Sequence, residues 1–196
     1  MGYTGSRSTF YRFLSKLKAE KAHIKAVERF ETLAGKQAQF VSSRAQGILF
    51  LGPPGVGKTH LSIALGLKAC EKRKRVLFVC ANELIDQLIV ARVNGSMGKK
   101  LQMLSRLDLL IIDELGYLPI NKEGANLFFQ LISRRYEKGS VIISSNKPFD
   151  EWADIFCDDV IAAAILDRLL HHCHIIVING PSYRTRDKMK AKSNDS

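Results

Sequence analysis

The chain has 196 residues, of which 46% are hydrophobic, and 30 Lys and Arg against 19 Asp and Glu give a formal net charge of +11. This length and apolar content suit one compact α/β domain with a modest appendage. No apolar run is long enough to span a bilayer and no apolar signal core opens the chain, so we expect a cytoplasmic protein. The positive excess attracts polyanions, which makes nucleic acid the leading partner and an acidic membrane surface the second.

The N-terminal segment, residues 1–46, is more basic than the rest of the chain. It holds nine Lys and Arg against three Glu, and so carries +6 of the net +11. Four apolar residues follow a capping Ser8-Thr9 pair with helical spacing, and a second helical stretch is expected over about residues 20–33. We therefore predict a short basic helical arm whose polar face is either simply solvated or in contact with DNA. The apolar residues are Phe10, Phe13, Leu14 and Leu17, and the polar face carries Arg12, Lys16 and Lys18.

From residue 47 onward, strand-type and helix-type segments alternate. Each strand candidate is a continuous apolar run, which is typical of a parallel sheet covered on both faces. The predicted fold is therefore a parallel five-stranded sheet sandwiched by helices over residues 47–184, and a basic tail, residues 185–196, is expected to be disordered. The expected strands are residues 48–51, 75–80, 109–112, 140–144 and 175–178, and the expected helices are 60–72, 83–93, 99–106, 125–138 and 160–171.

A glycine-rich loop follows the first of these strands and opens the first helix. It reads GPPGVGKT, which matches G-x-x-x-x-G-K-[ST] in the strand–loop–helix context that this phosphate-binding motif requires. Curled backbone N–H groups and the positive end of the helix dipole would bind phosphates there. We predict that Lys58 neutralises the β- and γ-phosphates of ATP and that the Thr59 hydroxyl binds Mg²⁺. The predicted nucleotide-binding residues are Gly52, Pro53, Pro54, Gly55, Val56, Gly57, Lys58, Thr59 and His60.

Two adjacent acids, Asp113 and Glu114, end the expected strand at residues 109–112. Sheets of this kind bind ligands at the carboxyl ends of their strands. Asp113 would hold the Mg²⁺ coordination shell, and Glu114 would polarise a water for attack on the γ-phosphate, as a hydrolase requires. An ordinary solvated strand end is the alternative.

Three further positions carry alternatives that the sequence leaves open. Asn146 directly follows the strand at residues 140–144 and would orient the attacking water, although asparagine is also a common turn residue. Arg168, in an otherwise apolar helix, either pairs with Asp167 or stabilises a phosphoryl group in a neighbour's site. The run HHCH at residues 171–174 has no second ligand cluster, so histidines that interact with a helix dipole are favoured over a metal site.

The cysteines lack the C-x-x-C spacing of zinc ribbons, and we expect reduced, mostly buried thiols.

The runs GPPGVGKTHL, LLIIDELG and AILDRLLHHCHII, with the SSN strand end, resemble the IstB-type helper ATPases of insertion sequences, which are relatives of the DnaC helicase loaders. The resemblance covers about residues 47–184 and implies a P-loop fold of the AAA+ type. It implies that Asp113 and Glu114 form the Walker B pair and that Asn146 is sensor one. Arg168 would be the arginine finger that acts on the adjacent subunit, and Arg184 would be a late arginine with a sensor role.

The same resemblance implies three partners: a homo-oligomer assembled on DNA, DNA contacted without sequence preference, and the transposase of the same element. No membrane partner is expected, because the chain has no long apolar run. Residues 1–39 resemble the N-terminal region of that IstA-type transposase, through GYTGS, VERFET and GKQAQ, but its catalytic aspartate does not follow. From the resemblance we expect that the helper family's N-terminal domain and the stretch that contacts adenine have no counterpart here. A transposition helper is the preferred function, and a helicase loader and a non-catalytic DNA-binding remnant stay open.

Overall fold

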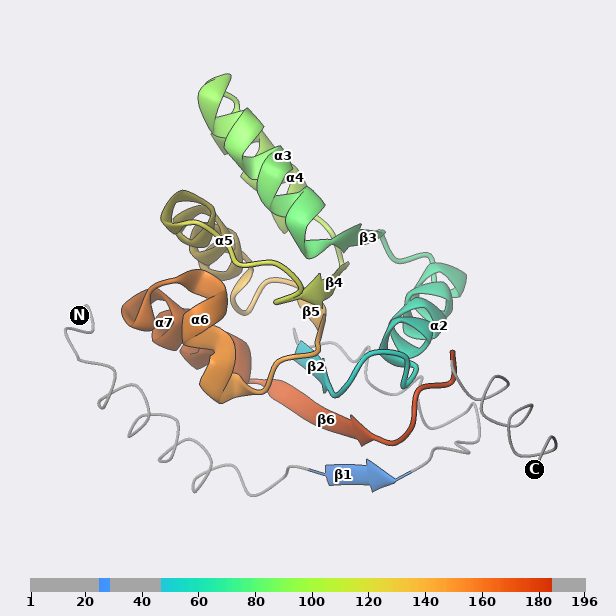
Figure 1. Ribbon diagram of the computed structural model, residues 1–196. Helices are drawn as coiled ribbons and strands as arrows, with labels where there is room; N and C mark the ends of the chain where they lie inside the picture. Colours follow the sequence, from blue (N-terminus) through green and yellow to red (C-terminus); the bar gives the residue numbers. More distant parts are fainter. Residues whose placement is uncertain (1–24, 29–46, 185–196) are drawn as a thin grey trace, which may run out of the picture.

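The computed structural model describes residues 25–28 and 47–184, which form one sheet with helices on both faces (Figure 1). The six strands are all paired in parallel, in the order β1-β6-β2-β5-β4-β3. The strands are β1 (Lys25–Glu28), β2 (Gly47–Leu51), β3 (Val76–Cys80), β4 (Leu109–Leu115), β5 (Ser140–Ser145) and β6 (Cys173–Asn179). The helices are α2 (Lys58–Glu71), α3 (Ala81–Val93), α4 (Met97–Ser105), α5 (Lys122–Arg135), the 3-10 turn η2 (Phe149–Glu151), α6 (Trp152–Phe156) and α7 (Asp159–Leu170).

The five strands and five helices expected from residue 47 onward are all present, and their ends lie within about three residues of the predicted ones. Between β5 and α7 the structure adds η2 and α6, which the sequence analysis did not predict because each is too short for a helical period to show. These two elements bury Trp152 and Phe156, whose rings lie edge to face with centroids 6.1 Å apart. Among the described residues, no helix combines the length and apolar character that crossing a bilayer requires.

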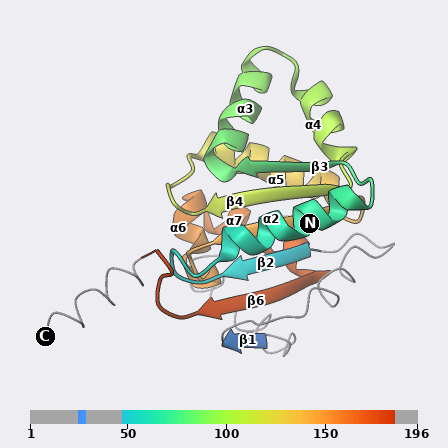
Figure 2. The same ribbon diagram turned by 90° about the vertical axis from the view of Figure 1, so that its right-hand side faces the viewer.

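The two faces of the sheet are covered unequally, as Figures 1 and 2 show. Alternate residues of a strand point to opposite faces, so Phe50 and Leu49 of β2 belong to different cores. Among the described helices, α2 alone packs on the face of Phe50, where it buries Leu65 and Ala69. The larger core, on the face of Leu49, is built with α3, α4, α5, α6 and α7. Burial of the strands on both sides explains why the sequence shows continuous apolar runs.

The strand β1 corrects the prediction for the N-terminal arm. The prediction of a helix at residues 20–33 is wrong for the centre of that range, where Lys25–Glu28 form a strand that pairs in parallel with β6. In this pairing Lys25 lies opposite Ile176, and Glu28 lies opposite Asn179. Over the described residues, the sheet therefore has six strands and not five. The edge of β6 offers unpaired backbone groups, and pairing with such an edge outweighs a weak local preference for helix. The amphipathic helix predicted at residues 10–17 and the basic tail at 185–196 lie outside the described residues, and the domain boundary at residue 47 stays a prediction.

The expectation of mostly buried thiols is also wrong. Cys70 and Cys157 are exposed, Cys80 and Cys173 are half-buried, and none of the four forms a disulfide. Cys70 lies on the solvent side of α2, and Cys157 caps the end of α6 in a left-handed conformation with φ 50°. Sequence spacing excludes a disulfide framework but does not report which face of a helix a thiol occupies.

The last residue of α5, Arg135, is a charged side chain in the core, only 2% exposed. Its guanidinium donates hydrogen bonds to the carbonyls of Leu104, of Leu107 at 3.3 Å and of Ser140 at 2.8 Å. Burial lowers the pKa of Arg135 to about 10, so the group remains charged at neutral pH. The three carbonyls lie at the end of α4 and just before or at the start of β4 and β5, so one side chain joins three elements.

An Arg135→Leu substitution is expected to lower the free energy of unfolding by about 3 kcal/mol, because it removes a buried guanidinium that donates hydrogen bonds to three carbonyls. Urea unfolding followed by circular dichroism measures this loss. Arg134→Leu is the matched control, since Arg134 is the exposed neighbour on the same helix and should change stability by less than about 0.5 kcal/mol. Equal losses in the two variants would contradict the role given to the buried guanidinium.

Candidate nucleotide-binding site

The predicted site residues lie at the carboxyl edge of the sheet. Strand β5 lies between β2 and β4, and its last residue, Ser145, pairs with Leu51 at the end of β2 and with Leu115 at the end of β4. Since parallel strands end at one edge, the loop after β2, the acids at the end of β4 and Asn146 after β5 meet there. Asn146 is half-buried at this position. The structure therefore brings together the elements on which the sequence prediction depends.

The glycine-rich loop turns tightly between β2 and α2. Gly55 has φ 80°, and a Cβ there would lie 2.1 Å from Ser182 Oγ, so the loop packs directly against the segment that follows β6. Gly57 caps α2 with φ 101°, and a Cβ there would have nothing within 4 Å among the described residues. The backbone conformation thus requires glycine at both positions, and the N-terminus of α2 faces open space of the kind that suits an anion.

Lys58, the first residue of α2, is at the centre of the loop. It is 9% exposed, and its Nζ donates to the carbonyls of Gly52 at 2.6 Å and Pro53 at 2.8 Å. Burial lowers the pKa of the Lys58 ammonium, the nearby Asp113 and Glu114 carboxylates act in the opposite direction, and Arg184 lowers the pKa further. The charges of both predicted acids therefore reach this lysine.

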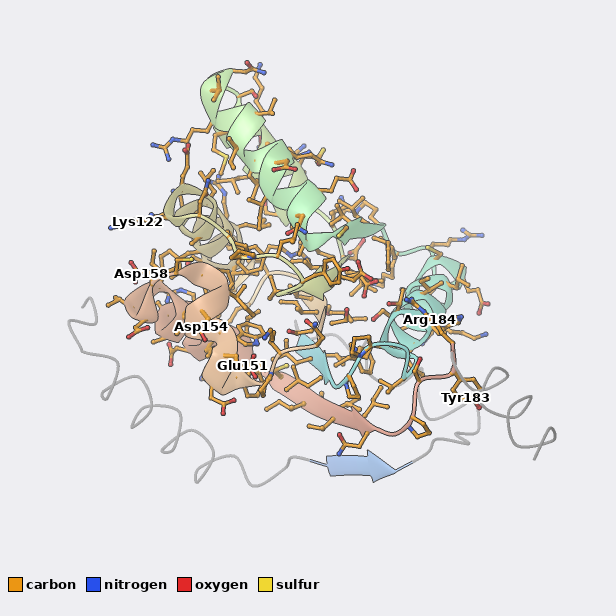
Figure 3. The ribbon with its side chains drawn as sticks, in the orientation of Figure 1. Lys122, Glu151, Asp154, Asp158, Tyr183 and Arg184 are labelled. Carbon is orange, nitrogen blue, oxygen red and sulfur yellow. The ribbon has the colours of Figure 1, made fainter. Side chains whose placement is uncertain are left out.

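The remaining predicted contacts surround this lysine at the surface. Figure 3 places Arg184 beside α2, and its backbone N–H donates to Ser182 Oγ at 3.2 Å. Thr59 is half-buried beside Lys58, whereas His60 is exposed. Of the other loop residues, Pro53 and Pro54 are exposed and Val56 is half-buried. The structure thus puts two cationic side chains, those of Lys58 and Arg184, at the loop.

The two acids at the end of β4 differ in their exposure to solvent, and the strand is irregular where they lie. Asp113 is 5% exposed, whereas Glu114 is exposed and has φ 60°. The ladder between β4 and β5 shifts register between Ile112 and Leu115, as in a β-bulge. A left-handed conformation at a non-glycine residue costs about 1–3 kcal/mol and is concentrated at functional sites. The bulge therefore presents Glu114 to solvent while Asp113 remains buried.

Ser144 of β5 is a site residue to which the sequence analysis gave no role. Its hydroxyl donates to Asp113 Oδ1 and accepts the N–H of Glu114 at 3.0 Å. It is 1% exposed, and a serine directly after the apolar run Val141-Ile142-Ile143 was the one signal that could have marked it. One hydroxyl thus holds both acids in place.

Ser144→Ala is expected to raise the Mg²⁺ concentration needed for half-maximal ATP turnover by about tenfold or more. The reason is that replacing a residue that orients a metal ligand commonly lowers the affinity for the metal by about that factor. Phosphate release measured across a Mg²⁺ titration tests this. Ser105→Ala is the control, since that exposed hydroxyl bonds only the carbonyl of Gln102 among the described contacts. An unchanged Mg²⁺ dependence would show that Ser144 is merely structural.

Arg168 lies at the opposite edge of the sheet from the glycine-rich loop. It lines a pocket with Gly47, Gly139 and His172, which are next to the starts of β2, β5 and β6. Its Nη1 donates to the Ala164 carbonyl at 3.2 Å, and its guanidinium carbon lies 4.6 Å from the centre of the Phe129 ring. Among the described residues it forms no ion pair with Asp167, the local alternative. Arg168 therefore does not belong to the loop site of its own chain.

Comparison with known sequences gives consistent matches. Residues 12–191 match the family model described as IstB-like ATP binding protein. The insertion sequence IS21 putative ATP-binding protein of Pseudomonas aeruginosa is 53% identical over 148 residues, which are 76% of this chain and 56% of that protein. The insertion sequence IS5376 putative ATP-binding protein of Geobacillus stearothermophilus is 48% identical over 145 residues, 74% of this chain and 58% of that protein. The chain thus spans somewhat more than half the length of these curated relatives. The resemblance of residues 1–39 to a transposase stays a prediction.

Solved structures share the fold. The replication initiator DnaA bound to AMPPCP and single-stranded DNA superposes with a TM-score of 0.63 at 20% identity, over 82% of this chain and 49% of that chain. The DnaC helicase loader superposes with a TM-score of 0.61 at 22% identity, over 83% of this chain and 99% of that chain. At these identities the likeness concerns the fold alone, and it confirms the predicted α/β fold, a parallel sheet sandwiched by helices.

Proposed function

The chain belongs to the family of IstB-like ATP-binding proteins, and from this membership we propose that it is an ATP-hydrolysing, DNA-binding helper of transposition. The proposal of ATP hydrolysis rests on one observation: Lys58, Asp113 and Glu114 lie together at one edge of the sheet. A buried cation in a glycine-rich loop, a buried carboxylate and an exposed carboxylate are the groups that hydrolysis of a nucleoside triphosphate requires.

Each residue has a separate role in the proposed mechanism. The loop N–H groups and Lys58 bind the phosphates, and Arg184 adds a second positive charge beside them. Thr59 and Asp113 would hold Mg²⁺, which supplies further neutralisation of the phosphate charge. Asp113 fits this role because Ser144 bonds its Oδ1, so Oδ2 is the candidate ligand. Glu114 accepts a proton from the attacking water, and the Asn146 amide orients that water.

The position of Arg168 supports a homo-oligomer. Because it lies at the edge opposite its own loop, its guanidinium is remote from the site of its own chain and would complete the site of another copy. A planar, permanently charged group stabilises the charge that spreads over a phosphoryl group during transfer. We propose that ATP bound between copies holds them together on DNA, that hydrolysis releases them, and that the transposase of the same element is the protein partner.

A steady-state ATPase assay with and without duplex DNA tests the proposal. We expect turnover that DNA increases, since assembly on DNA would bring Arg168 to neighbouring sites. ATP binding without turnover under either condition would favour the non-catalytic remnant. A helicase loader is the other alternative, and it would respond to a replicative helicase and not to the transposase.

DNA affinity is expected to fall steeply with salt and to depend little on sequence, because the net charge of +11 would attract the phosphate backbone and not particular bases. If about six phosphates are neutralised, affinity should fall by about a thousandfold between about 50 and 200 mM salt. Fluorescence anisotropy with two duplexes of unrelated sequence measures both properties. A flat salt response, or a strong preference for one duplex, would contradict the electrostatic argument.

A further inference from the structure

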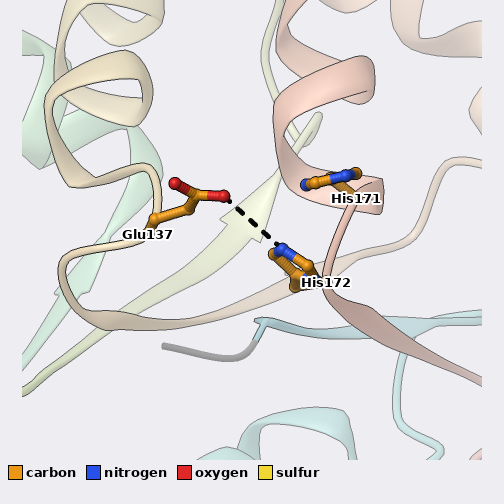
Figure 4. Close-up of side chains that lie close together, drawn as sticks. All are labelled: Glu137, His171 and His172. Carbon is orange, nitrogen blue, oxygen red and sulfur yellow. Dashed lines mark ion pairs between the residues drawn. The ribbon is translucent and has the colours of Figure 1, made fainter. Parts of the chain in front are cut away.

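Two histidines and one glutamate meet at the edge of the sheet opposite the nucleotide site (Figure 4). Glu137 lies in the turn after α5, and His171 and His172 follow α7. One ligand atom from each of the three residues lies within 4.8 Å of the other two. Glu137 Oε1 is 3.6 Å from His172 Nε2, and the two imidazole centroids are 4.0 Å apart. The sequence analysis disfavoured a metal because it lacked a second source of ligands, and the fold supplies one in Glu137.

The donor set and spacing fit a transition metal ion. Two imidazole nitrogens and one carboxylate oxygen are the ligands that Zn²⁺ takes in open sites. Bonds of about 2.0–2.2 Å in a tetrahedral shell put two donors about 3.4 Å apart, close to the separation between Glu137 and His172. The fourth position of such a shell is left for water or for a ligand from outside the chain.

A neighbouring side chain orients one of the histidines. The Tyr136 hydroxyl is hydrogen-bonded to His171 Nδ1, which leaves Nε2 of that ring as the candidate donor. Metal-bound histidines are commonly held in this way through their second nitrogen. An exposed ion pair between Glu137 and His172 would account for their contact alone, but it gives no role to His171 or to its bond with Tyr136.

We propose that Glu137, His171 and His172 bind a divalent transition metal ion such as Zn²⁺. All three side chains are exposed, so an ion reaches them from solvent. The metal joins the turn after α5 to the end of α7, and Glu137 and His172 also line the pocket that contains Arg168. Binding at this site does not depend on the proposed ATPase activity, although the ion would stiffen the surroundings of Arg168.

Titration of the full chain with Zn²⁺, followed by calorimetry after chelator treatment and without nucleotide, tests the proposal. Replacing a ligand, as in Glu137→Gln or His172→Gln, is expected to weaken binding by at least about tenfold. Glu137→His retains a donor at that position and should restore most of the affinity. Co²⁺ provides a second readout, because its visible absorption reports coordination by these side chains.

Two control variants separate this site from its neighbours. His174→Gln removes a nearby exposed histidine outside the cluster, and Cys173→Ser removes the adjacent thiol. Both should bind Zn²⁺ like the unaltered chain. Circular dichroism melting in chelator establishes that each variant is folded. A loss in either control as large as in His172→Gln, or unchanged binding when all three ligands are replaced together, would overturn the proposal.

Discussion

Replacing Lys58 by alanine is expected to abolish ATP binding, whereas replacing Glu114 by glutamine is expected to preserve binding and abolish turnover. Lys58 is the buried cation of the loop, and removing one partner of such a charge pair costs about 2–5 kcal/mol, or roughly 30- to 5,000-fold in affinity. Glu114 is exposed at the bulge of β4, and loss of a general base lowers turnover by about 10²- to 10⁴-fold.

Equilibrium binding of a fluorescent ATP analogue and phosphate release under saturating ATP measure the two effects separately. Lys68→Ala is the matched control for the lysine, since Lys68 lies on the same helix, pairs only with Glu71 among the described residues and is exposed. It should leave binding and turnover unchanged. If Lys58→Ala and Glu114→Gln lost binding to the same degree, the division of roles between cation and base would be wrong.

The second large effect concerns Arg168. An Arg168→Ala chain alone is expected to bind ATP normally and to hydrolyse it about a thousandfold more slowly, as when an arginine finger is removed. Adding Lys58→Ala chains should restore part of the rate, because they lack a working loop but supply Arg168 to the intact loop of the other chain. ATPase rates at a fixed total concentration and a varied mixing ratio measure the rescue.

Arg134→Ala controls for the general loss of an arginine, since Arg134 is exposed at the end of α5, and it should not slow turnover. The size of the mixed oligomers establishes that both chains assemble together. Mixed oligomers without rescue at any ratio would mean that Arg168 only packs on Phe129 and bonds the Ala164 carbonyl.

The sequence predicted those features that local patterns encode. Continuous apolar runs predicted the strands β2 to β6, and the loop motif predicted the position of Lys58 and the start of α2. Both signals are local, because each consists of residues that are neighbours along the chain. The left-handed conformation of Glu114 was not predictable, since it arises from a register shift against β5 and glutamate has no preference for it.

Contacts between distant segments were the features that the sequence could not predict. Ser144 acquires its role only because β5 lies beside β4, and Glu137 meets His171 and His172 only because α5 and α7 end side by side. The strand β1 likewise depends on the edge of β6, where a stretch with helical periodicity finds a partner. In each case the deciding interaction joins residues that lie far apart along the chain.

The close packing of Gly55 against Ser182 has a thermodynamic consequence. The Gly55 carbonyl accepts the N–H of Tyr183 at 2.9 Å, so the glycine-rich loop and the chain after β6 share a backbone hydrogen bond. A ligand that changes the loop conformation must therefore also change the free energy of residues 182–184. Thermodynamic linkage makes this effect reciprocal. A partner that binds residues 182–184 and disturbs this contact would change the affinity for nucleotide by a certain factor, and nucleotide would change the affinity for that partner by the same factor.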